Sequence, residues 1–94
     1  MDKVEARKVI DQHLASYRTR KYSDLATQVG DTIGFQAIAP SGIDYNVEVM
    51  LVWDSFEGGN IRVMVAVDDT RWPSWFHPMS DDFIVAPDGS FVGK

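Results

Sequence analysis

The segment that decides the fold runs from Ile43 to Asp69 and reads IDYNVEVMLVWDSFEGGNIRVMVAVDD. Over 43–53, and again over 61–67, every odd-numbered position is apolar or aromatic. Side chains alternate between the two faces of a β-strand, so each half presents one continuous apolar face. Both halves are also rich in β-branched residues, which suit a pleated sheet. The segment therefore predicts two long antiparallel strands folded against each other.

The loop between these strands sets which residues lie opposite each other. A two-residue turn at Gly58 and Gly59 would expose the apolar face of one strand, because a shift of one residue moves every side chain to the other face. A three-residue loop, 57–59, keeps both apolar faces together and suits a glycine at its end. This loop predicts that Trp53 lies opposite Val63.

A third strand is predicted over 32–39, just before this segment. The turn that follows it, Pro-Ser-Gly at 40–42, has proline early and glycine last, as tight turns do. It places Ile33 opposite Val49, which keeps the same face apolar independently of the second loop. Gly34 lies on the other face of this strand, where glycine indicates a bulge or the close approach of another backbone. The apolar odd positions of the strand are Ile33, Phe35, Ala37 and Ala39.

Two helices are predicted before the strands. The first covers residues 2–18, with Asp2 as its N-cap and Glu5 completing a capping-box pair. The second covers residues 22–29, between Ser23 as a cap and Gly30 as a stop, with an extended edge segment as the alternative. The apolar stripe of the first helix recurs at three- and four-residue spacing and consists of Ala6, Val9, Ile10, His13, Leu14 and Tyr17.

These elements, with a last short hairpin over 83–92, predict a single α+β domain over residues 1–94. In it the N-terminal helix packs on a curved antiparallel sheet of four to five strands in sequential hairpin order. The layout resembles the cystatin/monellin architecture, or a reduced form of the NTF2-like cone. Where cystatins carry Gln-Val-Val-Ala-Gly in the first turn region, this chain has Ala-Pro-Ser-Gly at 39–42 and Glu-Gly-Gly-Asn at 57–60. An inhibitor role therefore does not carry over from the layout.

Composition excludes several classes of protein. The chain has 94 residues and no cysteine, so neither a disulfide framework nor thiolate chemistry is expected. No apolar run reaches the roughly 18 residues that a membrane span needs, and the start, Met-Asp-Lys-Val-Glu, is unlike a signal peptide. We therefore expect a cytoplasmic protein with no membrane partner. No metal or cofactor motif occurs, so no cofactor is expected.

The net charge of −5 is unevenly distributed. Residues 1–21 carry six basic and three acidic side chains, whereas residues 22–94 carry three basic and eleven acidic ones. An acidic sheet argues against nucleic acid as a partner, because phosphate binding requires cations. The basic N-terminal part is expected to pair with the acidic body, with an anionic partner as the alternative.

One candidate binding surface combines the even-numbered face of the central hairpin with the irregular segment after it. The even face has an apolar centre, to which Ala66 also belongs, and the irregular segment is crowded with aromatic residues that either wall a pocket or fill the core. The surface predicts a non-enzymatic binding or protein-interaction domain, for a protein or a small molecule, with a homodimer through the sheet as one form. The candidate residues are Met50, Val52, Met64, Trp72, Trp75, Phe76 and His77.

The sequence allows three alternatives. A small enzyme or ligand-binding cone would use a pocket near His77, Asp81 and Tyr45. A metal held by His77 with Asp68 and Asp69 has no diagnostic spacing to support it. An adaptor that binds a basic partner through its acidic body would show steeply salt-dependent binding.

Overall fold

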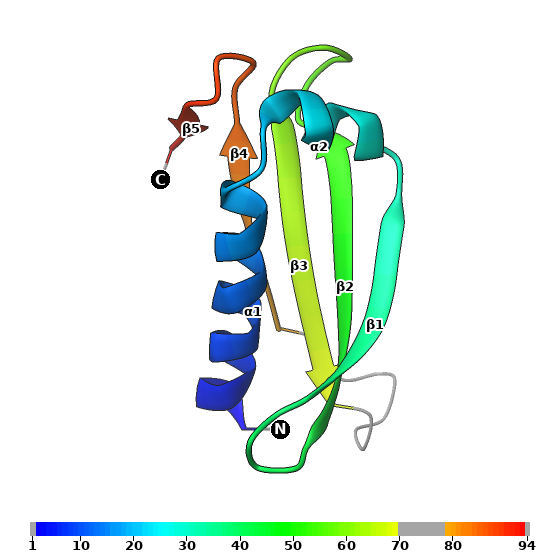
Figure 1. The fold of residues 1–94 in the computed structure, drawn as a ribbon, viewed down its shortest axis with the longest axis vertical. Coiled ribbons are helices and arrows are strands. Elements are labelled where there is room, and N and C mark those ends of the chain that lie inside the picture. Colours follow the sequence, from blue (N-terminus) through cyan, green and yellow to red (C-terminus); the bar gives the residue numbers. More distant parts are fainter. Residues whose placement is uncertain (1, 70–78, 94) are drawn as a thin grey trace.

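The computed structural model describes residues 2–69 and 79–93. The strands form one antiparallel sheet in the order β1-β2-β3-β4-β5, and each strand pairs with the next one along the chain (Figure 1). This confirms the predicted α+β class, with an N-terminal helical region and an open sheet of five strands. The elements are α1 (Lys3–Arg18), α2 (Tyr22–Gln28), β1 (Thr32–Ile38), β2 (Asp44–Trp53), β3 (Ile61–Asp69), β4 (Met79–Val85) and β5 (Phe91–Val92).

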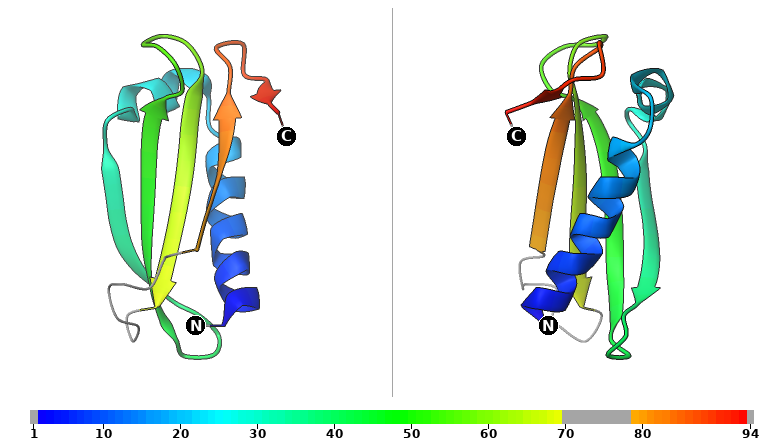
Figure 2. Two further views of the ribbon diagram at one scale, coloured as in Figure 1. Left: turned by 180° about the vertical axis from the view of Figure 1, so that it is seen from behind. Right: turned by 60° about the vertical axis from the view of Figure 1, so that its left-hand side comes forward.

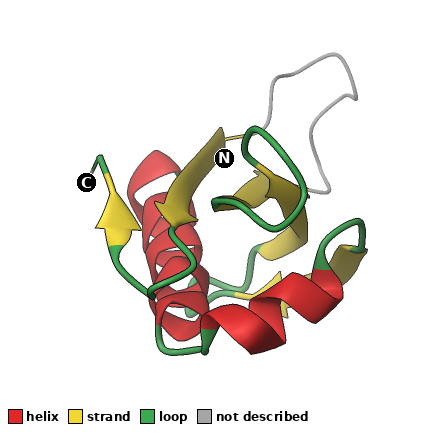
Figure 3. Cartoon of the chain, turned by 90° about the horizontal axis from the view of Figure 1, so that it is seen from above, coloured by secondary structure: helices red, strands yellow, loops and turns green. Residues whose placement is uncertain are grey.

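Both helices lie on one side of the sheet, as the views from behind and from above show (Figures 2 and 3). We call this side the inner face and the opposite side the outer face. Helix α1 packs mainly on β3 and β4, and α2 covers one end of the sheet with the buried side chain of Leu25. None of the described helices is long and apolar enough to cross a membrane.

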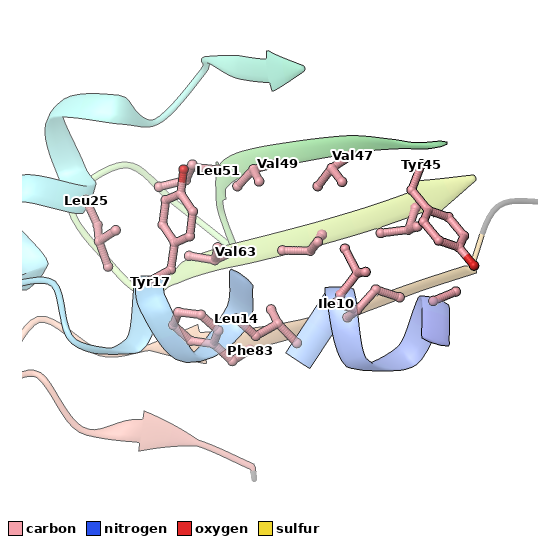
Figure 4. Packing of buried hydrophobic residues seen from close by; sticks show 14 of the residues in the cluster. Ile10, Leu14, Tyr17, Leu25, Tyr45, Val47, Val49, Leu51, Val63 and Phe83 are labelled. Atoms are coloured by element: carbon pink, nitrogen blue, oxygen red, sulfur yellow. The ribbon is translucent and has the colours of Figure 1, made fainter. Parts of the chain in front are cut away.

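The core lies between α1 and the odd-numbered residues of β2 and β3 (Figure 4). The predicted apolar stripe is confirmed except at His13, which is half-buried; the buried residues of α1 are Ala6, Val9, Ile10, Leu14 and Tyr17. Burial of these aliphatic side chains is the main favourable term in the folding of such a domain. The strand residues of the core include Tyr45, Val47, Val49, Leu51, Ile61, Val63, Val65, Val67, Phe83 and Val85.

The start of α1 is tied to the β1–β2 hairpin. Asp2 is the N-cap and accepts a hydrogen bond of 3.1 Å from the Glu5 backbone N–H, as the sequence predicts. The Glu5 carboxylate, however, reaches across to the hairpin, where it accepts hydrogen bonds from Ser41 and from the Tyr45 hydroxyl. The predicted capping-box role of Glu5 is therefore replaced by a bond between elements about forty residues apart in sequence.

The register between β1 and β2 is as predicted, with Ile33 opposite Val49. The turn closes with a bond of 3.0 Å from Ala39 N–H to the Ile43 carbonyl, and Gly42 has φ 88°, which favours glycine. The pairing is continuous through Gly34, so the bulge expected there is absent. A Cβ added at Gly34 would meet nothing within 4 Å, so none of the described backbone approaches it closely either.

The register between β2 and β3 differs from the prediction by two residues. Trp53 lies opposite Ile61, not Val63, because the loop spans 54–60 instead of 57–59. A bond of 2.8 Å from Asp54 N–H to the Asn60 carbonyl closes this longer loop, and the Tyr22 hydroxyl of α2 bonds to its glycine carbonyls. A shift of two residues keeps every side chain on its predicted face, so the buried set is unchanged.

Strand β1 is less covered than the sequence predicts. Phe35 shares the inner face with Val47, yet it is 39% exposed. The reason is that α1 packs on β3 and β4, closer to the opposite edge of the sheet. Its ring contacts the ring of His13 at a centroid distance of 5.0 Å. A helix lying off-centre thus leaves one edge of the inner face open.

The two remaining predicted elements are present, with two changes: the N-cap of the short helix differs, and the first strand of the last hairpin begins at Met79 instead of residue 83. The short helix exists, but its N-cap is Lys21, and Ser23 lies inside its first turn. Gly30 follows the helix with φ 94°, consistent with its predicted role as a stop. The last hairpin closes with a bond of 2.8 Å from Ala86 N–H to the Ser90 carbonyl.

Candidate binding surface

The outer face carries the apolar centre that the even-numbered positions predict. Met50 of β2 and Met64 of β3 lie directly opposite each other. Met50 is 37% exposed, whereas Val52, Met64 and Ala66 are half-buried. We call these four residues the outer patch. Because both helices lie on the inner face, no described helix covers the outer patch.

An ion-pair cluster borders the outer patch on one side. Arg62 lies opposite Val52 in the sheet, and its guanidinium donates to Asp54 Oδ1 at 2.9 and 3.2 Å and to Asp82. The hydrogen bonds with Asp54 and then with Asp82 raise the pKa of Arg62. The one described cation on this part of the outer face is therefore already matched by two carboxylates.

The other side of the outer patch is acidic and slightly hollow. Asp44, Glu48 and Asp68 are exposed there, and Asn46 donates a bond of 3.0 Å to Asp68 Oδ1. Asn46, Glu48 and Asp68 border a depression of about 400 Å³. Its lining residues are Gly34, Phe35, Gln36, Asn46, Val47, Glu48, Ala66 and Asp68.

The aromatic half of the candidate site is not described. Trp72, Trp75, Phe76 and His77 fall within 70–78, outside the described residues. Their part in a binding site stays a prediction. The three candidate residues that are described, Met50, Val52 and Met64, are together on one face, as the alternation predicts.

The residues of the alternative pocket are separated within the described chain. Tyr45 and Asp81 are both on the inner face, but Asp81 pairs with Val65, which pairs with Val49, four residues along β2 from Tyr45. Four residues of strand correspond to roughly 13 Å. Asp81 binds the Arg7 guanidinium of α1 at 2.5 Å, so it takes part in a contact between the helix and the sheet.

Tyr45 is itself part of the core. Its side chain is fully buried, and its hydroxyl donates to Glu5 Oε1 at 3.1 Å and contacts the Asp2 carbonyl at 3.4 Å. Burial, followed by the hydrogen bond with Glu5, raises the pKa of Tyr45 to about 12. A phenol held protonated in this way is a poor general base at neutral pH.

The sequence analysis named Asp69 only as a candidate metal ligand and missed that this acidic side chain is buried at this end of the core. Asp69 is only 2% exposed and lies opposite Tyr45. The signal was available, because Asp69 continues the odd-numbered series of β3 and the alternation therefore directs it inward. Within 2–69 and 79–93, no group of three or more histidine or acidic side chains is placed to hold a metal ion.

Comparison of the chain with models of protein families, with curated proteins and with solved structures finds no match. The α+β class with an open antiparallel sheet thus rests on the structure itself. The cystatin-like or reduced NTF2-like layout stays a prediction.

Proposed function

We propose that this protein is a protein-interaction domain that binds an apolar, basic segment of a partner protein on the outer face of its sheet. One observation carries the proposal: the outer patch is partly exposed at the centre of a sheet face that no described helix covers. Contiguous exposed apolar surface of this kind is typical of an interaction site.

The chemistry of the outer patch favours an adaptable apolar partner. Methionine has a flexible, polarisable side chain that can fit differently shaped surfaces, and Met50 and Met64 lie opposite each other. Covering their exposed area would remove apolar surface from water, which favours binding by about 25 cal/mol per Å² before the costs of association.

The charges around the outer patch favour a basic partner. Asp44, Glu48 and Asp68 are exposed, while Arg62 is matched by Asp54 and Asp82. Complementary charge on a partner accelerates association and selects against acidic competitors. The same charges oppose stacking of two outer faces, because two copies would bring like charges together.

A pair of model peptides tests this proposal. We expect a labelled peptide of alternating leucine and lysine to bind more tightly than its leucine–glutamate counterpart, with affinity falling as salt rises. Replacing Met50 and Met64 by Thr should weaken binding without changing the net charge. The matched control is Val4→Thr, which removes an exposed apolar side chain from α1. Equal binding of both peptides, or full binding by the double variant, would contradict the proposal.

A small-molecule site is the second candidate, and the depression beside Glu48 and Asp68 favours it. Its volume of about 400 Å³ falls within the range of ligand pockets, and its carboxylates suit a cationic ligand. Tryptophan fluorescence during titration with a set of organic cations tests it. Saturable quenching by one of them that Glu48→Gln abolishes is the expected result, and no response to any of them rules this candidate out.

A further inference from the structure

One edge of β1 is paired with no described strand, and we call it the free edge; it has none of the features that keep sheet edges apart. The strand is seven residues long and reads TIGFQAI, with no charged residue and no proline. Natural edge strands are usually short, charged or interrupted. The opposite edge of the sheet, β5, follows that rule because it has only two residues.

The direction of the unpaired backbone groups follows from the observed pairing. Ala39 N–H bonds to the Ile43 carbonyl, and bonded residues alternate along an antiparallel strand. The odd-numbered residues of β1 therefore bond to β2, and the even-numbered residues direct their N–H and carbonyl groups to the free edge. These outward residues are Thr32, Gly34, Gln36 and Ile38.

We propose that two copies of this chain pair through β1, antiparallel and about a two-fold axis, to form one continuous ten-stranded sheet. A single symmetric register uses all seven residues of the strand and all four outward residues. It places Gly34 opposite Gln36 of the second copy, and Thr32 opposite Ile38. Phe35 then lies on the axis, opposite Phe35 of the second copy.

This register covers the apolar side chains that β1 exposes. Ile38 is 75% exposed and Phe35 is 39% exposed. Phe35 would form a non-hydrogen-bonded pair, where the two Cα atoms approach to about 4.5 Å and aromatic side chains pack well. Ile38 would lie beside Thr32 of the second copy. Helix α1 packs mainly on β3 and β4, and its contact with Phe35 through the His13 ring leaves Phe35 39% exposed next to this edge.

Gly34 has a use in this arrangement that it lacks in the single chain. It lies opposite Glu48 in β2, and no described atom occupies the space where its side chain would be. Gln36 of the second copy would reach over this gap, so that its amide can donate to the Glu48 carboxylate. Because the two copies are related by a two-fold axis, this bond forms once on each side of the axis.

Sedimentation velocity with charge-swapped variants tests both the dimer and its register. We expect the unmodified chain to change from monomer to dimer between about 1 μM and about 1 mM. Phe35→Lys and Phe35→Glu should each weaken the dimer at least about tenfold, because like charges would face each other on the axis. An equimolar mixture of the two variants should restore it. Val4→Lys, on α1, is the control and should leave the dimer unchanged.

Amide hydrogen exchange gives a second measurement that needs no variant. The N–H groups of Gly34 and Gln36 should become protected as concentration rises, whereas Phe35 N–H, bonded to β2, should be protected throughout. Two results would overturn the proposal: a chain that is still monomeric at about 1 mM, or a dimer that Phe35→Lys leaves intact. The dimer does not depend on the outer patch, so replacing Met50 and Met64 by Thr should not affect it.

Discussion

The Tyr45 hydroxyl donates a hydrogen bond of 3.1 Å to Glu5 Oε1, and this bond joins the inner face of the sheet to the first turn of α1. The bond therefore holds the N-terminal end of α1 against the sheet. Tyr45 is fully buried and the bond itself is partly buried, so its loss would leave the tyrosine hydroxyl without this partner in the core, which is costly.

This bond predicts a loss of stability in alkali. The pKa of Tyr45 rises from 10.0 to about 12, mainly through burial. Below pH 10 the phenol is protonated in both states, whereas above it the unfolded chain releases the proton first. The free energy of unfolding should therefore be unaffected by this group below pH 10 and fall towards pH 12. Urea denaturation at a series of pH values measures this, and Tyr45→Phe should make the decline shallower. An unchanged decline would count against this assignment.

Gly34 and Gly58 should respond differently to replacement by alanine. Gly58 has φ 85° in the β2–β3 loop, so Gly58→Ala should destabilise the fold by about 1 kcal/mol. Gly34 lies in regular strand with open space around it, so Gly34→Ala should be neutral or stabilising. Thermal denaturation at low concentration distinguishes them, and an equal cost for both would contradict the strain expected at the positive φ of Gly58.

Two phenylalanines on the inner face differ in burial, so their replacement should lower the free energy of unfolding by different amounts. Phe83 of β4 is 1% exposed and Phe35 of β1 is 39% exposed. Phe83→Ala should cost about 3–5 kcal/mol, as for other buried phenylalanines, whereas Phe35→Ala should cost less than about 1 kcal/mol at concentrations where the chain is monomeric. Chemical denaturation measures both. Similar costs would show that α1 covers β1 as fully as β4.

The Arg62 cluster should be sensitive to the removal of its cation. Arg62→Ala leaves Asp54 and Asp82 close together without the guanidinium between them. Stability should fall, and the fall should be larger at low salt, where repulsion is less screened. Adding Asp82→Asn to this variant should recover part of the loss, as a double-mutant cycle would show. Equal losses at low and high salt would indicate a role in packing alone.

The strand pattern predicted the buried face because alternation is a local property of the chain. The turn at 40–42 also predicted its register, since proline and glycine define a tight turn locally. The β2–β3 loop was predicted too short, because Tyr22, far away in sequence, helps to hold the longer loop. The exposure of Phe35 was missed for a similar reason: it depends on where α1 packs, which no local pattern encodes.

The candidate site divides in the same way. Met50, Val52 and Met64 were predicted together because their even spacing places them on one face. The link from Glu5 to Tyr45 could not be predicted, because a glutamate three residues after a cap is normally assigned to the cap itself. The burial of Asp69 could have been predicted, since it extends an apolar series by one more inward position.

The order of elements along the chain has a consequence for folding. Each strand pairs with its neighbour in sequence, so the sheet can grow by local steps that require little loop closure. Helix α1, in contrast, packs on β3 and β4, which follow it by more than forty residues. During translation, the apolar stripe of α1 would therefore stay exposed to water until those two strands emerge from the ribosome. During that interval the helix exposes apolar surface that a chaperone could bind.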